Sequence, residues 1–256
     1  MSSVLVLPFH QDERLGESIR LPEHITTHMI DLELPDSDQW SRLGVLYDAL
    51  ATEVAAAARG ASTPTRVVTG DCLATLGTLA GLQRCGLDPA LVWFDAHGDV
   101  HTRETSTSGY LGGMALRMAL GGDPALLADP LGLRALPEHR AVLVDARDLD
   151  PPEAAYLSHS QVRHTSIQEM SAHDLPSGPV LLHVDIDVID AAEVPGLRFP
   201  VHPGPTTAHL LDSLRTLFAS GQVVGFDIAC PWLEAANEAD ARHRVHLLDS
   251  LLSLTG

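Results

Sequence analysis

The sequence contains no lysine, and all 16 of its basic residues are arginine. This absence excludes mechanisms that need a lysine of the chain itself, such as Schiff-base formation or phosphate binding by a Gly-Lys-Ser/Thr loop. Against the 16 arginines stand 34 acidic residues, which gives a formal net charge of −18. Because affinity for phosphate comes largely from basic patches, this balance argues against nucleic acid or an anionic membrane as the main partner.

Cysteine is also scarce, and long apolar runs are absent. The three cysteines, Cys72, Cys85 and Cys230, cannot make a disulfide framework, and an odd number suits a reducing compartment. No apolar run reaches the roughly 18 residues that a membrane span needs, and residues 1–14 do not resemble a signal peptide. We therefore expect a cytoplasmic protein. Its length of 256 residues and 45% apolar content favour a single domain over residues 1–256.

Short β-branched runs alternate with helical patterns along the whole chain. Several runs, such as residues 180–184, are apolar at nearly every position, which fits strands covered by helices on both faces. We therefore predict a doubly wound α/β fold with three α/β/α layers and a mainly parallel sheet of about eight strands. The predicted strands are residues 4–9, 25–30, 66–69, 91–95, 141–145, 162–165, 180–185 and 223–228. Helices are predicted at residues 37–59, 206–220 and about 234–254.

Acidic side chains follow two of these strands at the points where the strands end. Asp95 ends strand 91–95 and His97 and Asp99 follow it, while Asp185 ends strand 180–185 and Asp187 follows it. Ligands of doubly wound folds bind at the carboxyl ends of strands, where such carboxylates repel one another unless cations compensate them. Either motif alone is more typical of solvated surface acids. Together they predict a dinuclear site for Mn²⁺ or a similar ion.

These motifs resemble the signatures of the arginase/agmatinase (ureohydrolase) family. The first is Trp93-Phe94-Asp95-Ala96-His97-Gly98-Asp99 followed by Thr107-Ser108-Gly109, and the second is His183-Val184-Asp185-Ile186-Asp187-Val188-Ile189-Asp190. Arg147-Asp148-Leu149-Asp150-Pro151 and Gly225-Phe226-Asp227-Ile228 resemble two further segments, so that the resemblance covers nearly the whole chain. The resemblance implies an arginase-like fold and a small guanidino or amino-acid-like substrate.

The resemblance also implies a set of metal ligands and a mechanism. Asp95 and Asp185 would bridge two Mn²⁺ ions, His97 and Asp187 would complete one ion, and Asp99 would complete the other. A water shared by the ions would become a hydroxide that attacks the guanidinium carbon. Asp99 would orient that hydroxide and pass a proton to the leaving amine, which makes it a catalytic residue.

Four positions depart from the family pattern, one of which, Ala191 in place of a proline of the second signature, affects only a turn. Cys72 stands where the first ion's remaining ligand is normally histidine; as a thiolate it would shift the preference towards Zn²⁺ or Fe²⁺, whereas otherwise it is a small buried residue that starts a helix. Gly112 stands where arginases carry a proton-shuttling histidine. Cys230 stands where the family has the glutamate that pairs with the guanidinium, and Glu234 is a candidate to replace it.

Other substrate contacts are carried over from the family. His101 is a candidate to replace the missing shuttle histidine, although its position in the family contacts the substrate carboxylate. Ser108 and Asp150 match the residues that hold the carboxylate and amino group of an α-amino acid. The alternatives are that Ser108 is an ordinary turn residue and that Asp150 is a helix N-cap.

Cys72, Glu104-Thr105 and residues 109–114 look most like the branch of the family that includes Nω-hydroxyarginine amidinohydrolase. The sequence thus predicts a metal-dependent amidinohydrolase. A second interpretation is a degenerate member that keeps the fold in a binding role, and a third is thiol chemistry by Cys72 and Cys230. The sequence leaves the oligomeric state open, a homo-oligomer included.

Overall fold

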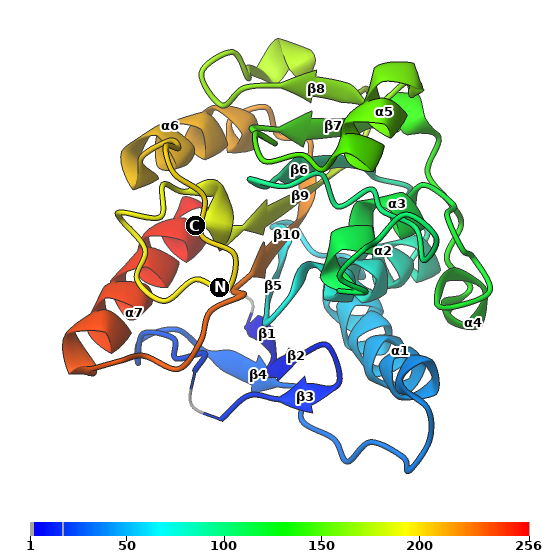
Figure 1. The fold of residues 1–256 in the computed structure, drawn as a ribbon. Helices are drawn as coiled ribbons and strands as arrows, with labels where there is room; N and C mark the ends of the chain where they lie inside the picture. The colour runs from blue at the N-terminus through cyan, green and yellow to red at the C-terminus, as the bar shows by residue number, and fades with distance from the viewer. Residues whose placement is uncertain (1–2, 17, 256) are drawn as a thin grey trace.

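A parallel sheet forms the centre of the protein (Figure 1). We analysed a computed structural model that describes residues 3–16 and 18–255, and within them eight strands join this sheet in the order β4-β1-β5-β10-β9-β6-β7-β8. Every neighbouring pair is parallel. The strands are β1 (Val4–Leu7), β4 (Thr27–Met29), β5 (Thr65–Thr69), β6 (Ala90–Phe94), β7 (Ala141–Val144), β8 (Arg163–Thr165), β9 (Val180–Asp185) and β10 (Val223–Ala229). The predicted α/β fold is confirmed, with each strand close to its expected position.

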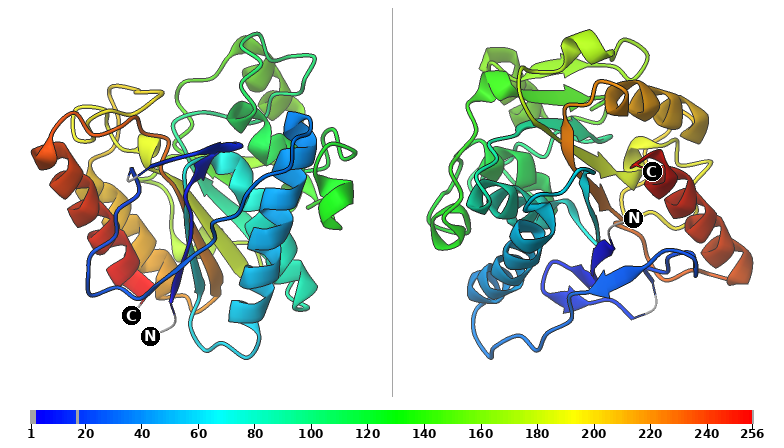
Figure 2. Two further views of the ribbon diagram at one scale, coloured as in Figure 1. Left: turned by 90° about the horizontal axis from the view of Figure 1, so that it is seen from below. Right: turned by 180° about the vertical axis from the view of Figure 1, so that it is seen from behind.

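Helices cover both faces of the sheet, as Figure 2 shows. Alternate residues of β1 show why: Leu5 and Leu7 enter the core on one face, while Val4 and Val6 enter the core on the other. The first core also contains residues of α1 (Gln39–Ala58), α2 (Thr75–Arg84), α3 (Ala115–Ala119) and α4 (Ala128–Leu131), and α5 (Pro151–His159) packs against it. The second contains residues of α6 (Thr207–Phe218) and α7 (Glu238–Leu252). These are the three predicted layers.

Two boundaries differ from those expected. The predicted strand 4–9 ends at Leu7, because Pro8 has no N–H to continue the ladder. Phe9–His10 instead forms β2, which pairs with β3 (Glu13–Arg14) in a separate antiparallel hairpin. The last helix begins at Glu238 and not near residue 234, because the side chain of Asn237 caps it by accepting hydrogen bonds from the N–H groups of Ala239 and Asp240.

Some expectations concern the chain as a whole. The single domain predicted over residues 1–256 includes residues 1, 2, 17 and 256, which lie outside the described residues. In the described part of the chain, no helix is both long enough and apolar enough to cross a membrane. All three cysteines are free thiols.

Helix α2 packs closely against α1 through glycine. A Cβ atom at Gly81 would lie 2.6 Å from the Ala51 carbonyl oxygen and 2.6 Å from Val54 Cβ. We expect Gly81→Ala to destabilise the protein by about 1–3 kcal/mol, because α1 must shift to admit the methyl group. Gly44→Ala is the matched control, since a Cβ there meets nothing within 4 Å. It should stabilise α1 by up to about 1 kcal/mol. Urea unfolding of both variants checks the difference, and an equal response would contradict it.

Candidate metal centre and active site

The central strands end at a cavity of about 320 Å³. β5, β6 and β9 each lead into loops that line it, and β10 between β5 and β9 contributes Pro231. Nine of the ten residues predicted for the site line this cavity: Cys72, Asp95, His97, Asp99, His101, Ser108, Asp150, Asp185 and Asp187. The structure therefore brings together side chains that lie up to 115 positions apart in the sequence, as between Cys72 and Asp187.

The segment after β6 curls so that its acidic side chains face inward. Asp95 Oδ1 accepts a hydrogen bond of 2.7 Å from the His97 N–H, which fixes the first turn. Asp99 has a φ of +53°, a left-handed conformation that aspartate tolerates better than most residues. A Cβ at Gly98 would lie 2.8 Å from Glu153 Oε1, so only glycine lets this loop approach α5 so closely.

The segment after β9 is held in a similar way. Asp185 caps the short 3₁₀ helix Ile186–Val188, and its Oδ1 accepts a hydrogen bond of 2.8 Å from the Asp187 N–H. Asp187 Oδ1 in turn accepts a hydrogen bond of 3.4 Å from the Ala96 N–H. Each carboxylate thus has an oxygen tied to the backbone, and the two strand ends are linked to each other.

Five of the predicted metal ligands lie within a few ångströms of one another. Cys72 Sγ is 2.7 Å from Asp185 Oδ2 and 3.9 Å from Asp95 Oδ2. His97 Nδ1 is 3.2 Å from Asp95 Oδ1 and 3.3 Å from Asp187 Oδ2. The arrangement offers a sulfur and carboxylates on one side, and an imidazole and carboxylates on the other.

The electrostatics of this cluster favour bound cations. Burial, followed by repulsion from neighbouring carboxylates, raises the pKa of Asp99 and of Asp185 well above the ordinary value and that of Asp187 to about 6. Burial opposes the charged form of His97, but hydrogen bonds with Asp187 and Asp95 raise its pKa to about 12. Asp99 Oδ2 is buried, and no group in the described part of the chain forms a hydrogen bond with it. An orphaned oxygen among so many buried acids fits divalent cations, and the donor set fits two of them.

A second polar group lies beside the metal ligands. His101 Nε2 is 3.1 Å from Asp150 Oδ2 and 3.9 Å from Glu153 Oε2, and its Nδ1 is 3.2 Å from Thr105 Oγ1. Asp150 is also the N-cap of α5, and Glu153 Oε2 accepts a hydrogen bond of 3.1 Å from its N–H. Asp150 is therefore a helix cap that also faces the cavity. Glu153, which is buried and whose pKa is raised by that burial, was not predicted.

Tyr110 fills the space beside Gly112, where the family carries its shuttle histidine. A Cβ at Gly112 would lie between 2.5 and 2.7 Å from atoms of the Tyr110 ring and hydroxyl. The Tyr110 hydroxyl is 3.3 Å from His10 Nε2, and the ring centroid is 4.6 Å from that of Phe199. Ser108 lines the cavity and also accepts a hydrogen bond of 3.2 Å from the Tyr110 N–H, so it has a turn role as well. Tyr110 and Phe199 are further lining residues that sequence reasoning missed.

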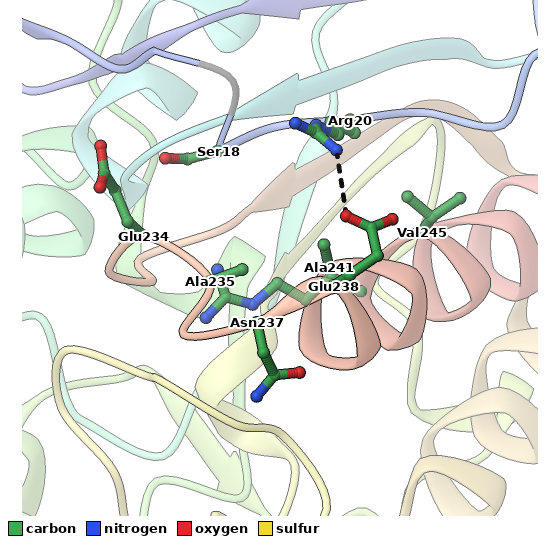
Figure 3. Close-up of a pocket in the computed structure, with 9 residues that line it drawn as sticks. Ser18, Arg20, Glu234, Ala235, Asn237, Glu238, Ala241 and Val245 are labelled. Carbon is green, nitrogen blue, oxygen red and sulfur yellow. Dashed lines mark ion pairs between the residues drawn. The ribbon is translucent and has the colours of Figure 1, made fainter.

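The remaining predicted contact, Cys230, does not line the cavity. It is fully buried in the core on the α6 and α7 face, and burial raises the pKa of its thiol well above the ordinary value. Glu234 lines a separate pocket of about 500 Å³ (Figure 3). There it lies with Arg20, which forms an ion pair of 3.9 Å with Glu238. Glu234 therefore does not replace the missing guanidinium-pairing glutamate in this conformation.

A comparison with known protein families agrees with this geometry. The sequence model of the arginase family matches residues 10–252. The chain belongs to the arginase family. It is 29% identical to the arginase of Bacillus subtilis over 202 residues, which cover 73% of this chain and 68% of that protein. It is 34% identical to the N(omega)-hydroxy-L-arginine amidinohydrolase of Streptomyces lavendulae over 169 residues, which cover 64% of this chain and 59% of that protein.

The length of these matches varies among arginase-family relatives. The match to the arginase of Bacillus caldovelox, 33% identical, covers 55% of this chain and only about half of that protein, 52%. In three dimensions, a crystal structure of Bacillus subtilis arginase matches 98% of this chain and 97% of its own, with a TM-score of 0.79 and 22% identity. A formimidoylglutamase from the same species matches with a TM-score of 0.71 and 16% identity, covering 98% of this chain and 86% of its own. Proteins named for different substrates therefore share this fold, so the fold alone does not identify the substrate of this chain.

Proposed function

We propose that this arginase-family protein is a metal-dependent amidinohydrolase that acts on the guanidino or hydroxyguanidino group of an arginine-like amino acid. The observation that carries the proposal is the cluster of buried carboxylates around Asp95 and Asp185 that, with His97 and Cys72, lines one cavity. Two divalent ions are the proposed cofactors, with Mn²⁺ first and Zn²⁺ or Fe²⁺ as alternatives because of the Cys72 sulfur. A cytoplasmic location is part of the proposal, supported by the three free thiols.

The chain's own residues suggest how the reaction is organised. Two bound divalent ions would supply the Lewis acidity that ionises a water molecule near neutral pH. Asp99 has an unpartnered oxygen in the cavity with which to orient that water and carry its proton to the leaving nitrogen. His101, held by Asp150 and Thr105, is placed to bind the amino-acid end of the substrate or to relay the proton outward.

The lining of the cavity supports a hydroxyguanidine over a guanidinium as the proposed substrate group. The position that supplies a glutamate in the family is Cys230, which is buried in the core, and its neighbour Pro231 lines the cavity instead. A fully charged guanidinium would therefore lose its ion pair at that point. A hydroxyguanidine is less basic, so the missing ion pair lowers its binding affinity less. The resemblance to the amidinohydrolase from Streptomyces lavendulae supports the same substrate group.

A second candidate function is a binding role in a degenerate member of the family. The replacements at Cys72, Gly112 and Cys230 favour it, whereas the retained carboxylate cluster argues against it, because unpaired buried acids are costly to keep. Metal analysis separates the two candidates. About two ions per chain supports the hydrolase, and no bound metal would rule it out.

The proposal is tested on protein reconstituted separately with Mn²⁺, Zn²⁺ and Fe²⁺. We expect Nω-hydroxyarginine to yield ornithine and hydroxyurea, with a higher kcat/KM than the conversion of arginine to ornithine and urea. Chromatography of the amine products measures both reactions. Asp99→Asn, with metal content verified, is the control for contaminating arginase. The proposal fails if the metal-loaded protein releases neither urea nor hydroxyurea.

Tyr110 supplies a further prediction about the substrate pocket. We expect Tyr110→Phe to lower kcat/KM for the hydroxyguanidino substrate about fivefold, because loss of the hydroxyl's hydrogen bond with His10 Nε2, worth roughly 1 kcal/mol, leaves a cavity-lining ring less firmly held. Tyr156→Phe is the matched control: Tyr156 bonds Arg117 and Glu138 outside the cavity. It should lower stability slightly and leave kcat/KM unchanged. Equal effects of the two variants on steady-state kinetics would remove Tyr110 from the pocket's function.

A further inference from the structure

His183 lies buried beneath the proposed metal centre but belongs to no predicted ligand set. It is on β9, two residues before Asp185, so its side chain leaves the same face of the strand. It stands in register between Trp93 of β6 and Asp227 of β10. The side chain is 0% exposed, and its ring centroid lies 3.7 Å from that of Trp93. The imidazole is thus fixed in place by its neighbours.

One ring nitrogen of His183 is held by polar groups. Nδ1 is 2.8 Å from Thr75 Oγ1 and 3.5 Å from Asp227 Oδ1. Asp227 is itself held by a hydrogen bond from the Thr78 hydroxyl to its Oδ2. The other nitrogen, Nε2, is buried and has no hydrogen-bond partner among the described residues. A buried polar atom left in this way is unfavourable unless a ligand occupies it.

The unpartnered nitrogen lies close to metal-ligating atoms. A ring nitrogen of His183, the Cys72 sulfur and a carboxylate oxygen of Asp95 are all within 4.8 Å of one another. Since Nδ1 is hydrogen-bonded to the Thr75 hydroxyl, Nε2 is the nitrogen available to a ligand. Cys72 is the position at which the family's histidine ligand is missing. We propose that His183 replaces that histidine, binding through Nε2 the ion that Cys72 and Asp95 hold.

The surroundings of His183 match those of metal-bound histidines. Such a histidine almost always donates its other N–H to a carboxylate, a carbonyl or water, which fixes the tautomer and the ring orientation. The Thr75 hydroxyl oxygen, 2.8 Å from Nδ1, can accept this N–H, and the Asp227 carboxylate lies nearby, 3.5 Å from Nδ1, without forming a hydrogen bond. The Sγ–Oδ2 separation of 3.9 Å between Cys72 and Asp95 is close to the roughly 3.5 Å edge of a tetrahedral zinc site.

The proposal makes the two metal positions chemically different. One receives a thiolate, an imidazole and carboxylates, a donor set that favours Zn²⁺ or Fe²⁺; the other keeps His97 with carboxylates and suits Mn²⁺. The inference rests on the metal centre of the proposed function and is independent of the substrate. Metal binding therefore tests it separately from turnover.

The test is cobalt titration of the full-length wild type and of His183→Asn, which keeps an amide near Nδ1 and removes the group at Nε2. In the wild type we expect about two Co²⁺ per chain, with a sulfur-to-cobalt charge-transfer band that disappears in Cys72→Ser. In His183→Asn we expect the ion responsible for that band to bind at least about 100-fold more weakly. The matched control is His10→Asn, a buried histidine outside the ligand groups, which should keep both ions.

Unchanged affinity and an unchanged cobalt spectrum in His183→Asn would overturn the inference. If that variant does not fold, ¹⁵N-histidine NMR of the wild type decides, because Zn²⁺ should shift one ring nitrogen of His183 as well as one of His97. A metal-dependent shift at His97 alone also overturns it. Loss of one ion in His183→Asn without turnover by the wild type would uphold the inference and defeat the proposed hydrolase. Turnover by the wild type, together with unchanged metal binding in His183→Asn, would uphold the proposed hydrolase and overturn the inference about His183.

Discussion

Asp185→Asn is expected to abolish hydrolysis and, at the same time, to stabilise the metal-free protein. In the proposed metal centre Asp185 would be a ligand of both ions, and loss of its charge would remove several kcal/mol of charge stabilisation, which lowers kcat at least about 10³-fold. In the metal-free protein the same charge is buried, and burial followed by repulsion from Asp187 and Asp95 raises its pKa well above the ordinary value. Removing it should stabilise the metal-free fold at pH 7 by roughly 1 kcal/mol or more.

The two halves of this expectation are measured separately. Steady-state kinetics with saturating metal gives the activity, and thermal unfolding in chelator at pH 7 gives the stability, with a rise in Tm of about 2–4 °C per kcal/mol. Asp190→Asn is the control from the same segment. Hydrogen bonds from His202 and from two backbone N–H groups hold the pKa of Asp190 at about 2, so its loss should destabilise the protein with or without metal. A metal-free Asp185→Asn protein less stable than the wild type would show that the carboxylates are not under electrostatic strain.

The fold could be predicted from the sequence wherever one residue type repeats over a whole element. Every strand of the large sheet was expected: central strands such as β9 are apolar at nearly every position, whereas the largely exposed edge strands β4 and β8 were predicted from β-branched runs. The hairpin of β2 and β3 was missed because two-residue strands carry no periodicity. The start of α7 was misplaced because Asn237 caps the helix, while residues 234–236, Glu-Ala-Ala, have the same helix-favouring composition as its first turn without being helical.

Only the site residues that belong to short sequence motifs could be predicted from the sequence. Asp95, His97 and Asp99 are close in sequence and end a strand, so their shared cavity follows from local geometry. Glu153 and Tyr110 enter the cavity through α5 and a loop, and no short-range spacing signals that. The alternation along β9 puts His183 on the face of Asp185, and this signal was present in the sequence. Only the packing of Trp93, Thr75 and Asp227 shows that one ring nitrogen is left unpartnered.

Metal removal is expected to reverse the pH dependence of stability. In the metal-free protein the pKa of Asp187 is raised by burial from 3.8 to about 6, and hydrogen bonds to Asp187 and Asp95 outweigh burial to raise that of His97 from 6.5 to about 12. Asp187 and His97 are each more protonated in the folded than in the unfolded protein. Each therefore contributes its full stabilisation at a pH below its pKa in the unfolded chain, and loses that contribution as the pH rises through its pKa in the folded protein. Stability of the metal-free protein should therefore fall between pH 4 and 6 through Asp187 and continue to fall above pH 6.5 through His97. The lowered pKa of Asp95 has the opposite effect on stability, but the pKa values of Asp99 and Asp185 are raised like that of Asp187 and add to the fall in stability.

Bound metal requires the same carboxylates ionised and His97 neutral, so binding releases protons and strengthens as the pH rises. At a metal concentration about 100 times Kd, the stabilisation is about 2.7 kcal/mol, which for a chain of this size raises Tm by roughly 5–10 °C. We therefore expect the Tm difference between metal-loaded and metal-free protein, measured at fixed Mn²⁺, to be small at pH 5 and to grow towards pH 8. Asp187→Asn should flatten the decline of the metal-free protein between pH 4 and 6, whereas Asp190→Asn should leave that slope in place. A Tm difference that stays constant across this range would mean that the buried acids do not exchange protons for metal, and the cluster would then not be the metal centre.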